Sequence, residues 1–305
     1  MTRLRAELIL LFIATLWAGT FPVIKISVDT IPPFLFISVR FFIAAVLFTL
    51  IYYKSIPVKD TKALKAGLLL AVFQMTGFGS QTLGMVYTSA SNSALITGIC
   101  ILFVPFVQYF VIKKSPTFEN WVGIAVVSIG LYLLTQPFEH GFNDGDLITL
   151  ICTLSWAFYI VLLDPFTKKY NINVLIFVQF WFVAIVSILI SLIFEDPLSL
   201  IRPSPSGRGW GGVFSTTDYY AIIYMGIAAT LITTTLGNRY QKYTTPIRAS
   251  IIFTWEQPAA VTMAIIFLAE KFGAVQIAGG ILMVAGILYS ETFEYFRNSN
   301  KKTVI

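Results

Sequence analysis

The residues most able to do chemistry are four ionisable side chains in or at the ends of long apolar stretches: Glu256, Arg40, Lys25 and Asp164. A charged group in lipid is costly unless it is paired or hydrated, so each needs a partner or a role. Glu256 could bind a proton or attract an amino group, or be a structural carboxylate paired to a basic residue or a helix terminus. Arg40 could bind a substrate carboxylate, pair with Glu256, or serve as a fixed structural charge that reaches an interface. Lys25 and Asp164 could gate a passage or simply mark the membrane surface.

Aromatic and amide side chains in the same stretches form a second set of candidates. The set comprises Trp17, Gln81, Asn92, Trp156, Tyr159, Asn238 and Trp255. An aromatic wall with a few polar groups suits a small amphipathic molecule, and cation–π attraction favours amines. Trp and Tyr also gather at membrane interfaces, and amides bond between helices as structural contacts. Trp17 and Trp156 lie about ten residues into their stretches, which favours a cavity over an interface.

The composition is that of an integral membrane protein. Of its 305 residues, 57% are hydrophobic and 12% are charged, where a soluble protein carries about a quarter charged residues. The net charge of +6 is concentrated in particular loops and predicts no nucleic-acid partner. Cys100 and Cys152 lie in apolar segments, and the single His140 excludes a multi-histidine metal site. No phosphate-binding loop or multi-carboxylate motif occurs, so we expect no metal, no cofactor and no ATPase activity.

Hydropathy predicts ten helical segments of roughly 17–23 residues, each long enough to cross a bilayer. They cover 7–28, 33–53, 66–87, 92–112, 120–137, 147–164, 174–194, 219–238, 248–268 and 272–291. Orientation follows from Lys and Arg, which favour the cytoplasmic side. With the N-terminus inside, 16 of the 21 basic residues fall on that side and the opposite loops are acidic. The sequence therefore predicts an all-α membrane protein with ten spans and both termini cytoplasmic.

The chain contains an internal repeat. The segment from Tyr87 to Ile96 is similar to the segment from Tyr243 to Ile252, 156 residues later, and Trp17 matches Trp156 at an offset of 139. Each half then has five spans, and an odd number inverts the second copy relative to the first. The predicted units are a first repeat at 1–138, a second at 145–291 and a cytoplasmic tail at 292–305. A Pro-, Ser- and Gly-rich insertion within 199–217 accounts for the change of offset and is expected to be a flexible loop or a lid.

Inverted repeats are common in transporters, and their sites lie between the halves. Under the offset of 156, Glu256 corresponds to Cys100, so this carboxylate belongs to one half only. Asn238 corresponds to Thr82, which makes it a candidate by symmetry. The asymmetry at Glu256 points to ion coupling or substrate selection.

Several short motifs together resemble the EamA-type branch of the drug/metabolite transporter superfamily. They are Trp17-Ala18-Gly19-Thr20-Phe21 with Lys25, then Arg40, then Tyr87-Thr88-Ser89-Ala90, and in the second half Gly145-Asp146-Leu147, Ser155-Trp156-Ala157, and Ala249-Ser250 with Glu256 and Glu270. The resemblance spans both halves. One departure is Gln257, which stands between Glu256 and Pro258 where relatives usually place the proline directly after the glutamate.

The resemblance implies a permease of the inner (plasma) membrane with a central cavity and alternating access, usually an exporter of metabolites or amino acids. The expected partners are a small-molecule substrate, the lipid bilayer and protons, with a monomer or a homodimer as the assembly. Two alternatives stay open. One is an importer or exchanger of another solute, such as a sugar derivative or a drug-like cation. The other is a membrane enzyme acting on a lipid-linked substrate, which the scattered acids and single histidine disfavour.

Overall fold

The computed structural model describes residues 2–57, 59–135, 143–195, 216–268 and 273–302. The helices are α1 (Arg3–Ala18), α2 (Thr20–Val28), α3 (Pro33–Tyr52), α4 (Thr61–Tyr87), α5 (Ala90–Gly98), α6 (Cys100–Ile112), α7 (Phe118–Thr135), α8 (Asp144–Lys169), α9 (Ile172–Phe194), α10 (Thr216–Ile223), α11 (Thr233–Tyr240), α12 (Pro246–Phe253), α13 (Glu256–Leu268) and α14 (Ala274–Lys302). Short turns η1 (Tyr53–Ser55) and η4 (Gln241–Tyr243) and a π-helical segment, η3 (Tyr224–Ile232), complete them. This described part has no strand, which agrees with the all-helical prediction.

Seven helical segments in the described ranges are long and apolar enough to cross a membrane. They are Arg3–Val28, Pro33–Ser55, Thr61–Tyr87, Asn92–Ile112, Asp144–Lys169, Ile172–Phe194 and Asp218–Tyr243. Phe118–Leu134 and Ala274–Tyr289 are shorter apolar helices, at the positions of the fifth and tenth predicted spans. The ninth predicted span is divided between α12 and α13, and α14 continues as a helix into the predicted tail. Most of the predicted loop at 199–217, together with His140 and Glu270, lies outside the described residues.

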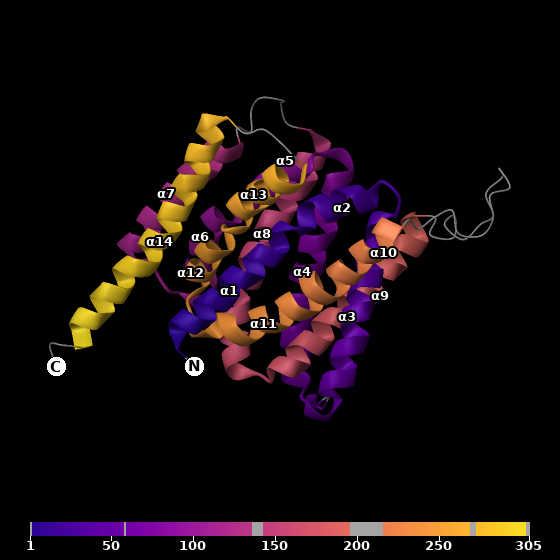
Figure 1. Ribbon diagram of the computed structural model, residues 1–305. Coiled ribbons are helices and arrows are strands. Elements are labelled where there is room, and N and C mark those ends of the chain that lie inside the picture. The colour runs from indigo at the N-terminus through magenta and orange to yellow at the C-terminus, as the bar shows by residue number, and fades with distance from the viewer. Residues whose placement is uncertain (1, 58, 136–142, 196–215, 269–272, 303–305) are drawn as a thin grey trace.

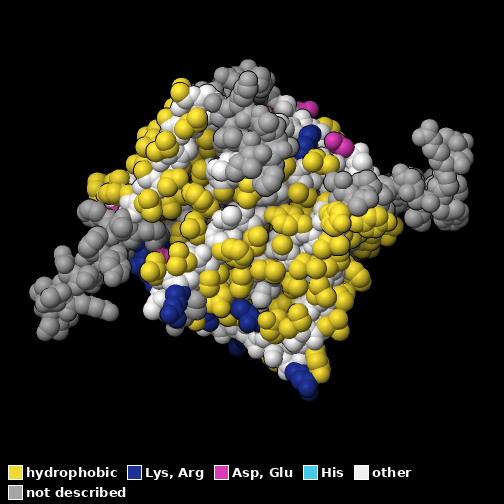
Figure 2. All heavy atoms as spheres, in the orientation of Figure 1, with side chains coloured by type: hydrophobic (Ala, Val, Ile, Leu, Met, Phe, Trp, Pro, Cys, Tyr) yellow, Lys and Arg dark blue, Asp and Glu magenta, His cyan; other side chains and the backbone are white. Residues whose placement is uncertain are grey.

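The outer surface matches the lipid environment that the composition predicts. Large apolar side chains such as Leu50, Phe110 and Phe194 are exposed. In Figure 2 hydrophobic side chains cover most of the visible face, with Lys and Arg mainly along its lower rim. Figure 1 shows the start of α1 and the end of α14 towards that same side. Such an apolar belt is what a bilayer covers.

Helices from distant parts of the chain pack together in matched pairs. α4 packs on α8 while α11 packs on α1, and α6 packs on α8 while α12 and α13 pack on α1. α4 contacts α9 while η3 contacts α3. α7 and α14 pair at one edge of the molecule (Figure 1). These contacts form pairs that correspond when the two halves are exchanged.

Two of the apolar stretches are broken by proline. Pro22 and Pro258 have no backbone N–H, and each ring clashes with the carbonyl four residues earlier. α1 ends at Ala18, four residues before Pro22. α12 gives way at Thr254, four residues before Pro258. Pro258 therefore sets the break in the ninth stretch, so the intervening Gln257 lies inside the first turn of α13.

Close packing of α7 and α14 depends on Gly279. A Cβ atom added there would lie 2.7 Å from the carbonyl oxygen of Gly130 and would collide with the backbone of Leu134. At the neighbouring Gly280 the nearest atom would be 3.7 Å away.

We predict that Gly279→Ala destabilises the protein by about 1–3 kcal/mol, because the two backbones must separate. Gly280→Ala is the matched control, with little change. Thermal unfolding of the purified proteins in detergent checks this, and equal melting temperatures for the two variants would contradict it.

Candidate functional site

A cavity lies in the middle of the helix bundle. Side chains from α1–α6, α8, η4 and α11–α13 line it, so both halves of the sequence contribute. Within this cavity, a volume of about 90 Å³ is open to the centres of water-sized molecules. Such a space between helices, mostly apolar with a few polar groups, is typical of small-molecule sites.

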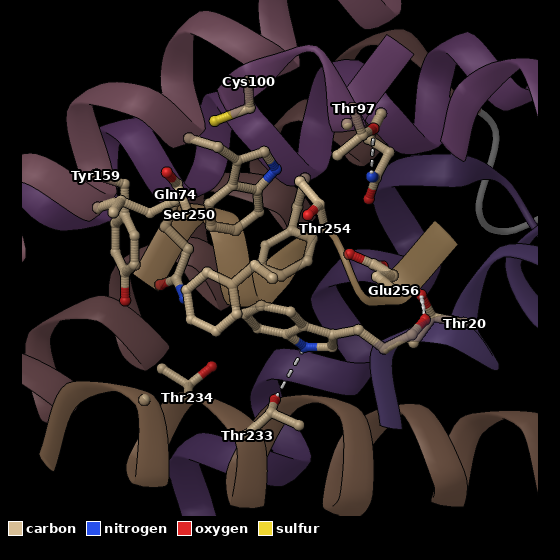
Figure 3. Close-up of a pocket in the computed structure, with 18 of the residues that line it drawn as sticks. Thr20, Gln74, Thr97, Cys100, Tyr159, Thr233, Thr234, Ser250, Thr254 and Glu256 are labelled. Carbon is tan, nitrogen blue, oxygen red and sulfur yellow. Dashed lines mark hydrogen bonds between the residues drawn. The ribbon is translucent and has the colours of Figure 1, made fainter. Parts of the chain in front are cut away.

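Two helix breaks lie side by side at this cavity, since Gln257 of one donates to the carbonyl of Ala94 beside the other. α6 begins at Cys100 and α13 begins at Glu256, 156 residues later. Both side chains line the cavity, as do Thr97 and Thr254 just before the breaks (Figure 3). Broken helices direct backbone polar groups into a cavity, as in transporters built from repeats. The breaks therefore follow the predicted offset, with a thiol in one half and a carboxylate in the other.

Aromatic rings form the body of the cavity. The ring centroids of Trp17 and Trp156 are 6.4 Å apart, and Phe253 lies 5.3 Å from Trp17. Phe78 meets Trp156 edge to face at 4.8 Å. In the close-up, aromatic rings lie between Tyr159 on one side and Glu256 on the other (Figure 3). The predicted central location of Trp17 and Trp156 agrees with this geometry.

The indole of Trp17 is fixed by the neighbouring half of the chain. Its Nε1–H bonds the hydroxyl of Thr233 at 3.1 Å and the carbonyl of Ala229 at 3.3 Å. Ala229 belongs to the π-helical segment η3, and such segments are frequent at functional sites. These bonds hold one aromatic wall against α11.

Glu256 is the cavity's only carboxylate among the lining residues. The side chain is 9% exposed, and within the described ranges no hydrogen bond or ion pair of its carboxylate is found. It belongs to the first turn of α13, where the helix dipole favours negative charge. A carboxylate that faces a cavity without a protein partner can bind a cationic group.

Arg40 supplies the opposite charge. It is 1% exposed, and its Nε–H donates to the hydroxyl of Thr230 at 2.9 Å. The guanidinium lies 4.5 Å from the centre of the Phe78 ring, and its Nη1 is buried with no hydrogen-bond partner in the described structure. A buried donor left unpaired is costly unless a ligand or water satisfies it. Glu256 is not an ion-pair partner of Arg40, so the predicted pairing of these two residues is not formed.

Three polar side chains brace one wall. Tyr159 Oη donates to Gln179 Oε1 at 2.8 Å, Gln179 Nε2 donates to Asn238 Oδ1 at 3.0 Å, and Asn238 Nδ2 donates back to Tyr159 at 3.0 Å. Both predicted residues, Tyr159 and Asn238, line the cavity, but their polar atoms are engaged with each other. Gln179 was not predicted; its only signal is an amide in the middle of a largely apolar helix.

We predict that Gln179→Leu lowers the free energy of unfolding by about 1–3 kcal/mol, because it leaves buried groups of Tyr159 and Asn238 unpaired. The control is Thr76→Val, whose exposed hydroxyl bonds only the carbonyl of Val72. Thermal unfolding compares them. A Gln179→Leu protein as stable as this control would show that the three-residue network contributes nothing.

The structure brings seven of the eleven predicted site residues into the cavity lining: Trp17, Arg40, Gln81, Trp156, Tyr159, Asn238 and Glu256. Gln81 donates to Thr97 at 3.0 Å. The lining also includes Gln74, Phe78, Thr97 and Thr254, which were not predicted as site residues. The cluster of polar residues in the third predicted span was a signal for Gln74, but periodicity alone could not tell which side faces the cavity.

Four predicted residues lie outside the lining. Lys25 Nζ donates to the carbonyl of Met85 at 2.8 Å, and Asp164 pairs with Lys168 at 2.5 Å. Trp255 donates to Thr15 at 3.0 Å. Asn92 is in the first turn of α5, where its backbone N–H bonds the capping Ser89.

Comparison with known proteins agrees with this architecture. The profile of the EamA-like transporter family matches residues 4–136 and 143–291. An uncharacterized transporter of Archaeoglobus fulgidus is 29% identical over 286 residues, which cover 94% of this chain and 85% of the relative. The uncharacterized transporter YcxC of Bacillus subtilis is 22% identical over 93% of this chain and 90% of its own.

A solved crystal structure has the same fold, with a TM-score of 0.74 and 15% sequence identity over 95% of this chain and 98% of that one. The two family matches cover both predicted repeats, and the apolar helices agree with a protein that crosses the membrane many times. This chain is therefore a multi-pass membrane protein that belongs to the EamA-like transporter family.

Proposed function

We propose that this protein is a secondary transporter or facilitator that exports small amphipathic metabolites, best matched by amino acids, across the inner membrane. One observation carries the proposal: a single aromatic cavity contains an unpaired carboxylate, Glu256, and a guanidinium with an unpaired donor, Arg40. The first suits an ammonium group and the second a carboxylate. Trp17, Trp156 and Phe253 supply the apolar surface for a side chain.

We further propose ten spans arranged as two inverted five-helix repeats, at 1–138 and 145–291, with a tail at 292–305 and both termini cytoplasmic. The matched helix contacts and the equivalent breaks at Cys100 and Glu256 support this topology. The halves would rock about the cavity to expose it to each side in turn. Because one chain supplies the whole lining, a monomer suffices for transport.

Export is proposed from the family resemblance, because the geometry of the cavity does not indicate in which direction the solute moves. Import or exchange of a drug-like cation would use the same aromatic rings and Glu256. Arg40 separates the two candidates, since a cation without a carboxylate has no use for it. A sugar derivative would need neither charge.

The test is uptake and efflux of labelled leucine by proteoliposomes, with isoamylamine, which lacks the carboxylate, isocaproate, which lacks the amine, and a hexose as comparison solutes. We expect leucine to move faster than all three and faster than in protein-free liposomes. Preference for isoamylamine would favour the cation transporter, and movement of the hexose alone would contradict the proposal.

A further inference from the structure

Two carboxylates occupy equivalent positions near opposite ends of the helix bundle. Glu7 in α1 and Asp146 in α8 are 139 residues apart, the offset that relates Trp17 to Trp156. Each accepts a hydrogen bond from a threonine, and Thr88 and Thr244 are 156 residues apart. The two contacts are therefore equivalent under the internal repeat, with the carboxylates related by the offset of 139 and the threonines by the offset of 156.

The contact at the N-terminal end joins α1 to the start of α12. Glu7 Oε1 accepts from Thr244 Oγ1 at 3.1 Å and from Arg248 Nη1 at 3.3 Å. Arg3, on the same helix, donates to that oxygen at 2.7 Å. Glu7 is 9% exposed and Arg248 is fully buried. We call Glu7, Thr244 and Arg248 the cytoplasmic latch.

The contact at the other end joins α8 to the end of α4. Asp146 Oδ1 accepts from Thr88 Oγ1 at 2.5 Å, and Asn143 Nδ2 also bonds the Thr88 hydroxyl at 3.4 Å. Asp146 is 2% exposed, and its second oxygen bonds the backbone N–H of Asn143. We call Asp146, Thr88 and Asn143 the external latch.

Each latch crosses from one half of the chain to the other. Glu7 lies in α1, in the first half, and bonds residues of the second half. Asp146 lies at the start of α8, in the second half, and bonds Thr88 of the first half. In Figure 1 α1 begins at the lower edge of the bundle and α5, which follows Thr88, lies near the upper edge. No rocking of the halves can widen one end while its latch stays closed, because the latch ties the two halves there.

We propose that these two latches are the gates of the transporter, each breaking when the cavity opens to its own side. The inference rests on the proposed rocking of the two halves. Hydrogen bonds to a buried carboxylate are strong and directional, so each latch holds a discrete closed end.

The two latches are not equal. Arg248 corresponds to Asn92 under the offset of 156, and Asn92 is half-buried with no part in the external latch. Only the cytoplasmic latch therefore includes a cation. The external end is then the easier one to open.

Threonine-to-valine changes test the latches with little disturbance, because valine has the same shape but no hydroxyl. Thr244→Val weakens the cytoplasmic latch and Thr88→Val weakens the external one, while Asp146 keeps its bonds to Asn143. Spin-label pairs at the exposed, equivalent positions Arg5 with Tyr243 and Asp144 with Tyr87 report each end. Distances are measured on the full-length protein in liposomes without solute.

We expect Thr244→Val to raise the ratio of open to closed cytoplasmic ends about tenfold, and Thr88→Val to do the same at the external end, as for loss of one bond to a charged group. In the double variant the ratio of molecules open to the cytoplasm to molecules open to the outside returns towards the wild-type value. Glu7→Gln acts as Thr244→Val does. Gln108→Leu, which removes a part-buried bond to the carbonyl of Lys114 within one half, is the control and shifts neither end.

Two populations at each end that neither valine variant shifts, or two valine variants that both open the same end, would overturn the latches and leave the rocking intact. A single distance at both ends in every variant would overturn the rocking as well. Failure of leucine transport has no bearing on this result, because no solute is present.

Discussion

Glu256→Gln is expected to weaken binding of leucine about 100-fold while the protein stays folded. The carboxylate faces the cavity without a partner among the described residues, so its neutral isostere removes the charge and leaves no buried cation behind. Loss of one partner from a desolvated ion pair with a ligand typically costs 2–5 kcal/mol, which matches such a loss in affinity. Isoamylamine, which keeps the ammonium group, should weaken by the same factor, and isocaproate should not.

Asp29→Asn is the control, because it removes one negative charge from an exposed position. Equilibrium binding to the purified variants gives the ratio of dissociation constants. Unchanged leucine affinity in Glu256→Gln would leave the carboxylate with a structural role, as a charge at the start of α13.

The same variant tests proton coupling. If Glu256 binds a proton and the solute in alternation, an imposed pH gradient should drive leucine transport by the wild type and have no effect in Glu256→Gln. Wild-type rates that ignore the gradient, with normal transport by the variant, would exclude coupling through this residue.

Arg40→Met is the second change with a large expected effect. It should weaken leucine and isocaproate about 30-fold or more and spare isoamylamine, since only carboxylate ligands use the unpaired Nη1. The change should be structurally mild: Thr230 keeps its bond to the carbonyl of Met225 at 2.6 Å, and methionine can still pack on Phe78.

Arg40→Lys is the companion variant, because it keeps the charge but loses the planar pair of donors and should recover only part of the affinity. A purely structural Arg40 would lower stability and all three affinities together. Equal loss for isoamylamine in Arg40→Met would contradict carboxylate recognition.

The sequence predicted the all-helical membrane architecture and the two tandem family repeats better than the interior of the bundle. Hydropathy and charge bias are averages over whole segments, so an error at a single position does not change the predicted segment. The offset of 156 correctly aligned Cys100 with Glu256, because the breaks they begin occupy equivalent places in both halves. Proline accounts for part of this: α1 ends at Ala18, four residues before Pro22, and α12 ends at Phe253, five residues before Pro258, whereas Pro105 and Pro165 lie inside α6 and α8.

Side-chain direction was the harder part. Asn92 is an amide in an apolar stretch, but it belongs to a capped first turn away from the cavity lining. Lys25 bonds a carbonyl of α4, and no local pattern encodes that long-range contact. The four latch residues could not be predicted one by one. Glu7 and Asp146, and likewise Thr88 and Thr244, stand out only when both offsets and the three-dimensional contacts are considered together.

The central claim is that the aromatic cavity binds an amino acid through both of its charges. Thermal unfolding of the purified protein with increasing leucine tests it most directly, because a ligand that binds only the folded state raises the melting temperature with occupancy. We predict a concentration-dependent rise for the wild type that is absent in the Glu256→Gln, Arg40→Met double variant. No rise for any amino acid, or an equal rise in the double variant, would contradict the claim.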